Sequence, residues 1–178
     1  MRLDPKYFNV FMLGIAIISA LAIFYATISY QGDQLSSFKS YVSESDSLVT
    51  SYMRVIASDD SIRISDFAGR PIALQFWSSW SQKSLHMQYE MKNRDGLDSL
   101  LIIAASVKDV LTDVERHMEE HNDSNIVFVD GTKIYNELKA AGIPSYILFN
   151  ASGEPVNANV GYKEGSIQDS LKYYLNNE

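Results

Sequence analysis

Hydrophobic residues form one long uninterrupted run near the start of the chain and, farther on, several short runs separated by polar segments. The long run, residues 10–30, contains no charged residue. A helix of this length spans about 31 Å, which matches the hydrocarbon core of a bilayer. The run therefore predicts a transmembrane helix, and its lack of a polar face argues against a buried helix of a soluble protein.

Charges at the two ends of this run predict its orientation. Arg2 and Lys6 precede it, and Asp33 is the first charge after it. By the positive-inside rule, residues 1–9 lie in the cytoplasm and the rest lies on the periplasmic or extracellular side of the cytoplasmic membrane. A cleaved signal peptide is the alternative, but its apolar region is usually only roughly 7 to 15 residues long. The A-x-A sequence, Ala20 to Ala22, also lies inside the run, which favours a retained single-pass anchor.

After the anchor, the pattern predicts a stalk and one α/β domain. Residues 31–51 are rich in Ser, Asp and Glu, with apolar residues at roughly helical spacing, and are interpreted as a partly helical stalk. Two β-prone runs flanking residues 58–61 predict a hairpin at the start of a domain that covers residues 52–178. Further strands are predicted at 72–77, 100–105, 125–129, 142–149 and 155–161, and helices at 84–94, 109–121, 132–141 and 166–175. The order β-α-β-α-β-α-β-β-α predicts a central mixed sheet flanked by helices.

Composition excludes several classes of function. The formal charge of −7 and the absence of a basic run argue against nucleic-acid binding. The chain has no cysteine, so disulfides, thiolate metal sites and cysteine nucleophiles are impossible. His117 and His121 are one helical turn apart, a spacing that fits a metal site, but no third ligand is placed near them in the sequence. We interpret the pair as part of a solvated helix face and predict neither a metal nor a cofactor.

The segment FWSSWSQKS, residues 76–84, runs from a predicted strand into a predicted helix. It resembles the active-site segment of thioredoxin-like proteins, F-W-A-x-W-C-x-x-C, with Ser81 and Ser84 at the two cysteine positions. Residues 64–77 are similar to the lead-in of the membrane-anchored TlpA/ResA type. Residues 142–149 resemble the strand of that family whose proline, here Pro144, is cis and faces the active-site helix. The resemblance covers about residues 54–176 and implies a thioredoxin-like sandwich.

The departures from that family concern its chemistry. In the family, the first cysteine lies at a helix N-terminus, where the unsatisfied N–H groups favour a thiolate. A serine at position 81 is instead expected to act as an N-cap. Gln75 stands where thioredoxin keeps a buried aspartate. We therefore expect a redox-inactive module that binds or scaffolds other proteins; the alternative is a thiol-disulfide oxidoreductase of the TlpA/ResA type whose cysteines were mutated in this copy.

The same resemblance predicts a binding groove for an extracytoplasmic protein or extended peptide. Its residues are Trp77, Trp80, Ile143 and Pro144. In this fold the loop before the cis proline exposes backbone groups that pair with an extended peptide by β-strand addition. Trp80 would add a large apolar contact beside that loop. The alternative is that Trp80 and Pro144 are present only because the fold needs them.

Overall fold

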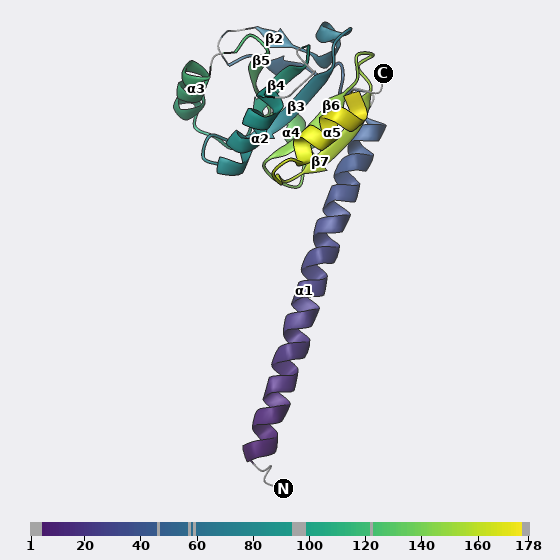
Figure 1. Ribbon diagram of the computed structural model, residues 1–178, viewed down its shortest axis with the longest axis vertical. Helices are drawn as coiled ribbons and strands as arrows, with labels where there is room; N and C mark the ends of the chain where they lie inside the picture. Colours follow the sequence, from purple (N-terminus) through teal and green to yellow (C-terminus); the bar gives the residue numbers. More distant parts are fainter. Residues whose placement is uncertain are drawn as a thin grey trace.

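The structure is a computed structural model that describes residues 5–45, 47–56, 58, 60–93, 99–121 and 123–175. Helix α1, Pro5–Glu44, projects from a globular domain and carries the N-terminus at its far end (Figure 1). Among the described residues it is the one helix that is long and apolar enough to cross a membrane, so it is a candidate transmembrane span. Arg2, which the orientation argument used, lies outside the described residues.

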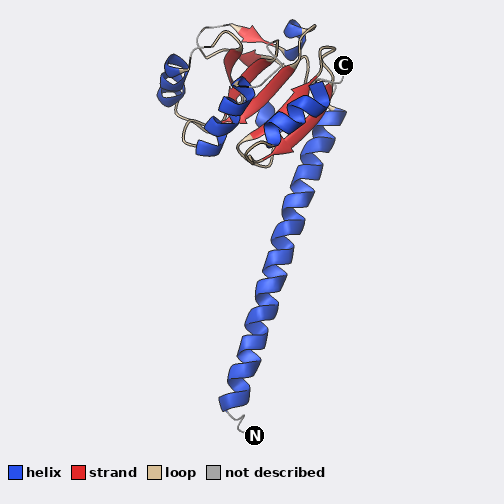
Figure 2. Ribbon diagram, viewed as in Figure 1, coloured by secondary structure: helices blue, strands red, loops and turns tan. Residues whose placement is uncertain are grey.

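A five-stranded mixed sheet forms the centre of the domain, in the order β5-β4-β3-β6-β7 (Figure 2). The strands are β3 (Ile72–Trp77), β4 (Leu101–Ser106), β5 (Ile126–Asp130), β6 (Ser145–Phe149) and β7 (Pro155–Val160). β4 is parallel to β3 and β5 to β4, whereas β6 is antiparallel to β3 and β7 to β6. Every residue of β3 and β4 is buried, as expected for continuous apolar strands covered on both faces. The predicted mixed sheet is confirmed.

Helices cover both faces of this sheet. One face packs against α2 (Gln82–Lys92), α3 (Leu111–Glu120) and α5 (Ser166–Leu175), which contribute Met87, Val114 and Leu171 to one core cluster. The other face packs against α4 (Thr132–Glu137) and the last turns of α1, which contribute Ile134 and Phe38 to a second cluster. A short antiparallel hairpin, β1 (Met53–Arg54) with β2 (Ser61–Ile62), and the 3₁₀ helix η1 (Ile64–Phe67) precede the sheet. The predicted hairpin is thus present, although Ala57 lies outside the described residues.

The predicted stalk at residues 31–51 differs from the structure. Helix α1 continues through this segment without a break to Glu44, and its end packs against the domain. Phe38 is fully buried, and Val42 and Leu48 are 5% and 2% exposed. Phe38 and Val42 are four residues apart, so they lie on the same face of the helix while the polar residues between them face solvent. The domain therefore begins before residue 52, and α1 is part of its core.

The fourth helix is shorter than the predicted range of 132–141. It ends at Glu137 with Leu138 as the C-cap, and the next residue, Lys139, has a left-handed backbone with φ of 49°. The N–H of Lys139 donates to the Asn136 carbonyl and the N–H of Ala140 donates to the Tyr135 carbonyl, which is the Schellman arrangement. Gly142 was expected to be the residue after the helix, but Lys139 takes that place.

Candidate functional site

The turn between β3 and α2, which contains the serine-substituted motif, is fixed to the loop after β4. The buried hydroxyl of Ser78 donates to the Val107 carbonyl. The backbone N–H of Ser79 donates to the carboxylate of Asp109, and the Ser79 hydroxyl donates to the same carboxylate at 2.8 Å. The N–H of Ser81 donates to the Ser78 carbonyl at 3.1 Å. The bonds to Val107 and Asp109 cross-link two loops at the carboxyl ends of adjacent parallel strands.

The two serines at the cysteine positions lie at the start of α2 and differ in their hydrogen bonds. Ser81 caps α2: its Oγ accepts from the Ser84 N–H at 3.3 Å, and its carbonyl accepts from the Leu85 N–H at 3.2 Å. The predicted N-cap is confirmed. Ser84 is fully buried, and its Oγ has no hydrogen-bond partner in the described part of the chain. Neither hydroxyl bonds to a histidine or carboxylate there, so neither has the adjacent base that activates a serine nucleophile.

A chain of buried amides leads from this motif into the domain. Gln75, in β3, donates from Nε2 to the Ser84 carbonyl at 2.8 Å. Gln88, in α2, donates from Nε2 to Gln75 Oε1 at 3.4 Å. Its own Oε1 lies 2.8 Å from Nε2 of His117. Because an amide oxygen can only accept, His117 donates from Nε2. Gln75 therefore satisfies the helix backbone at the motif, where the family's aspartate would place an ionisable group.

The sequence predicts His117 on a solvated helix face, but the structure buries it. It is only 8% exposed, its ring centroid lies 4.7 Å from that of Trp77, and it stacks on His121 at 4.2 Å. Burial, with a smaller contribution from the charge of His121, lowers the pKa of His117 to about 4. The side chain is thus neutral near pH 7. In the described part of the chain no group of three His, Asp or Glu side chains is placed to hold a metal ion.

The four residues of the predicted groove do not form one surface. Trp77 is fully buried between His117 and Phe128, so it cannot line a groove. The Ile143–Pro144 bond is cis, as predicted, but Pro144 is buried and its carbonyl accepts from the Gly161 N–H at 2.7 Å. Ile143 is half-buried against the core of the opposite sheet face.

Trp80 is the groove residue that the structure does expose. Its side chain is 64% exposed, and its indole N–H donates to the Lys108 carbonyl at 3.2 Å. Lys108 lies in the loop after β4; Val110, which precedes α3, is 60% exposed, and Leu111, the first residue of α3, is 50% exposed. We call Trp80, Lys108, Val110 and Leu111 the Trp80 surface. The predicted groove is therefore corrected to a surface that lies over the loop after β4.

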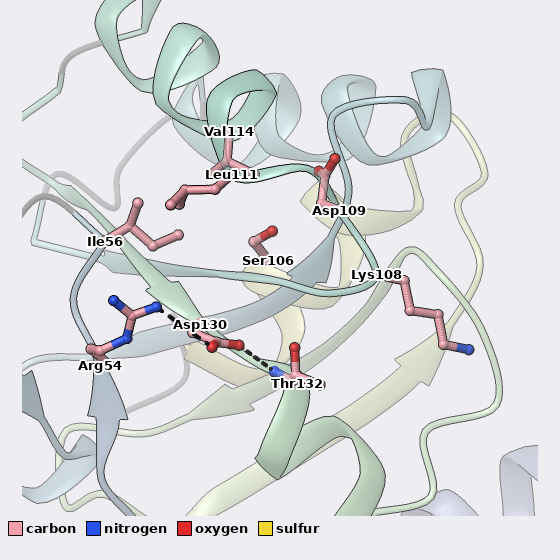
Figure 3. Close-up of a pocket in the computed structure, with 9 residues that line it drawn as sticks. All are labelled: Arg54, Ile56, Ser106, Lys108, Asp109, Leu111, Val114, Asp130 and Thr132. Carbon is pink, nitrogen blue, oxygen red and sulfur yellow. Dashed lines mark hydrogen bonds and ion pairs between the residues drawn. The ribbon is translucent and has the colours of Figure 1, made fainter.

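A pocket of about 260 Å³ adjoins this surface, at the carboxyl ends of β4 and β5 (Figure 3). It is lined by Arg54, Ile56, Ser106, Lys108, Asp109, Leu111, Val114, Asp130 and Thr132. Its charged groups include an ion pair between Arg54 and Asp130 at 3.9 Å, and the N–H of Thr132 donates to Asp130 at 3.0 Å. Sequence reasoning missed this pocket. The signal was the pair of polar segments that follow two neighbouring parallel strands, the usual place for ligands in α/β sheets.

Comparisons with known proteins establish the fold. No protein-family model and no curated protein matches the sequence. Solved structures do: a secreted disulfide oxidoreductase of Mycobacterium tuberculosis is 14% identical, with a TM-score of 0.55 over 75% of this chain and 100% of that one. The exposed lipoprotein thioredoxin of Streptococcus pneumoniae is 21% identical, with a TM-score of 0.51 over 69% and 98% of the two chains. StoA from Bacillus subtilis is also 21% identical, with a TM-score of 0.51 over 70% and 94%. The domain thus has the thioredoxin-like fold of disulfide oxidoreductases without any cysteine.

Proposed function

We propose that this chain is a membrane-anchored, extracytoplasmic thioredoxin-like protein of the TlpA/ResA type that binds a protein partner and does not exchange disulfides. The observation that carries the proposal is the arrangement of the side chains in the motif, residues 76–84. Ser81 caps α2, Ser84 is buried in α2, and the second tryptophan, Trp80, remains exposed and is held by a hydrogen bond to Lys108.

The chemistry of the motif supports the redox-inactive part of the proposal. Disulfide exchange begins with a thiolate that attacks a sulfur atom, and the chain has no sulfur nucleophile. The Ser81 oxygen already accepts a hydrogen bond from the helix that would otherwise stabilise a thiolate. The buried groups behind it, Gln75 and Gln88, are uncharged amides that do not relay protons as an aspartate does.

The Trp80 surface supports the binding part. Exposed aromatic residues are frequent anchors of protein interfaces, and Val110 and Leu111, which follow the Lys108 that Trp80 contacts, are exposed and apolar. The bonds from Ser79 to Asp109 and from Trp80 to Lys108 hold both loops before any partner arrives. A surface that is ordered in advance loses less conformational entropy on binding.

The anchoring and location rest on α1. Its charge-free run matches a bilayer in length, and the bias of Arg2 and Lys6 favours a cytoplasmic N-terminus. The similar structures include a secreted protein and an exposed lipoprotein, as their descriptions state. Protease added outside spheroplasts should digest the domain while the intact protein pellets with membranes. A soluble, shortened product would instead indicate a cleaved signal peptide.

The binding proposal is tested by capture of partners from membrane extracts with the full-length protein. We expect Trp80→Ala to weaken capture by ~2 kcal/mol, or roughly thirtyfold, as is usual for an aromatic anchor. Tyr89→Ala is the matched control, because Tyr89 is an aromatic residue on α2 with 69% exposure outside the Trp80 surface. Equal recovery of the same proteins by all three forms would refute the role of Trp80.

The fold neighbours favour a second candidate, a thiol-disulfide oxidoreductase whose cysteines have been replaced in this copy. Both candidates predict no activity for the chain as written, so an insulin-turbidity assay with dithiothreitol tests them through restored cysteines. We expect the chain as written to match the reductant-only rate, and the double variant Ser81→Cys with Ser84→Cys to exceed it. A folded double variant that stays inactive would mean that the site has changed beyond the loss of its thiols.

A further inference from the structure

A groove of about 800 Å³ lies between α1 and the end of the domain where α2 begins. One wall is a stretch of α1 that includes Ile28, Gln31 and Leu35, and the other includes Lys83 of α2 and Tyr162 after β7. In Figure 1, α1 leaves the domain on this side and runs toward the N-terminus. The groove therefore opens along the helix toward the predicted membrane span.

The depth of the groove relative to the bilayer follows from the sequence of α1. The charge-free run ends at Tyr30, and Asp33 is the first charge beyond it. If the run spans the hydrocarbon core, residues 31–35 rise about 7 Å above its edge, at 1.5 Å per residue. The headgroup layer of one leaflet is roughly 5 to 8 Å thick. The groove thus covers the height of the headgroups and reaches the edge of the acyl chains.

The residues that line the groove change from apolar to polar with height above the membrane. A phospholipid changes in the same order, from acyl chain to headgroup. Ile28 lies at the level of the acyl chains, and the amide of Gln31 follows one turn higher. Lys83 is the one charged side chain that lines the groove; it is exposed and has no ion pair within the described part of the chain. A cation without a partner at headgroup height matches a lipid phosphate. The volume is also that of a small-molecule site and not of an extended protein interface.

We propose that this groove binds an anionic phospholipid of the surrounding leaflet, with the phosphate on Lys83 and an acyl chain along Ile28. The inference rests on the membrane anchoring in the proposed function and not on the Trp80 surface. Such a lipid would join α1 to the membrane-facing end of the domain and fix the tilt of the domain on the bilayer.

The test uses the full-length protein in nanodiscs of phosphatidylcholine with a minor fraction of phosphatidylglycerol. After gentle extraction into detergent, native mass spectrometry counts the lipids that each chain retains. We expect preferential retention of phosphatidylglycerol, and a loss of about fivefold with Lys83→Gln, because one basic residue near a membrane contributes about 1 kcal/mol. Lys163→Gln is the matched control: Lys163 is exposed and follows Tyr162 but does not line the groove, so retention should be unchanged.

Three results would overturn the inference. These are no preference for phosphatidylglycerol in the wild type, an equal loss in both lysine variants, or a co-purified polypeptide that is lost with Lys83→Gln while the lipid count stays the same. A chain that does not fractionate with membranes would refute the proposed anchoring itself. Fractionation therefore distinguishes failure of the proposed function from failure of the lipid site.

Discussion

His117 should make the stability of the domain depend on pH in a range where most side chains do not titrate. Burial lowers its pKa from the ordinary value of 6.5 to about 4 in the folded protein. Between these values the unfolded chain binds a proton that the folded chain does not. Its stabilising contribution is therefore fully present above pH 6.5 and is lost as the pH falls toward 4. At pH 5 this difference in proton binding lowers the free energy of unfolding by about 2 kcal/mol relative to its value at high pH. Most of that decrease occurs between pH 7 and pH 5.

The measurement is urea unfolding of the full-length protein in detergent at pH 7, 6 and 5. A Trp80→Phe background leaves Trp77 as the sole tryptophan reporter, 4.7 Å from the His117 ring centroid. His117→Gln is the control, because an amide N–H can still donate to Gln88 but does not titrate in this range. We expect a steep loss of stability below pH 6.5 in the background and a much shallower one in the glutamine variant. Equal slopes would refute the assignment of a buried neutral histidine.

Two pairs of substitutions test the cap of α2 and the packing of α1 against the domain. Ser81→Ala removes the cap of α2 and should lower the free energy of unfolding by about 1 kcal/mol, whereas Ser84→Ala, whose hydroxyl has no partner in the described part of the chain, should change it far less in the same urea titration. Phe38→Ala should lower it by about 3 to 5 kcal/mol, because a fully buried aromatic side chain leaves a cavity, and the exposed Phe24 of the same helix is the control. A Phe38→Ala midpoint equal to that of Phe24→Ala would restore the interpretation of residues 31–51 as a stalk.

The strands of the sheet were predictable because burial on both faces leaves a local signature, a continuous apolar run between turn residues. A second local signal locates the start of α2, since a serine directly before a predicted helix, here Ser81, favours an N-cap. The burial of Phe38 was not predictable in this way. Its neighbours in the sequence are Ser37 and Lys39, and only the position of β7 beside the end of α1 decides that this face of the helix is covered.

The site itself was predicted only in part, for two physical reasons. Ala73, Gln75 and Trp77 are spaced two residues apart along β3, so their side chains lie on the same face of the sheet. This is the face that α2 covers. The resemblance to a motif did not use that period and assigned Trp77 to the groove. Lys139 shows the second reason: a left-handed residue after a helix is usually glycine, and a lysine gives no such signal.

Among the described residues, the buried side chains behind the motif carry no charge at neutral pH, which bears on what the domain can do. Gln75 and Gln88 carry no charge, and the lowered pKa of His117 keeps it neutral at physiological pH. A redox site of this fold must accommodate a thiolate and the protons that leave and return with each turnover, and a buried ionisable group serves that need. A neutral chain of amides instead offers fixed hydrogen bonds, which stabilise one arrangement of β3, α2 and α3. The residues behind the serines therefore form a rigid support for the turn that exposes Trp80.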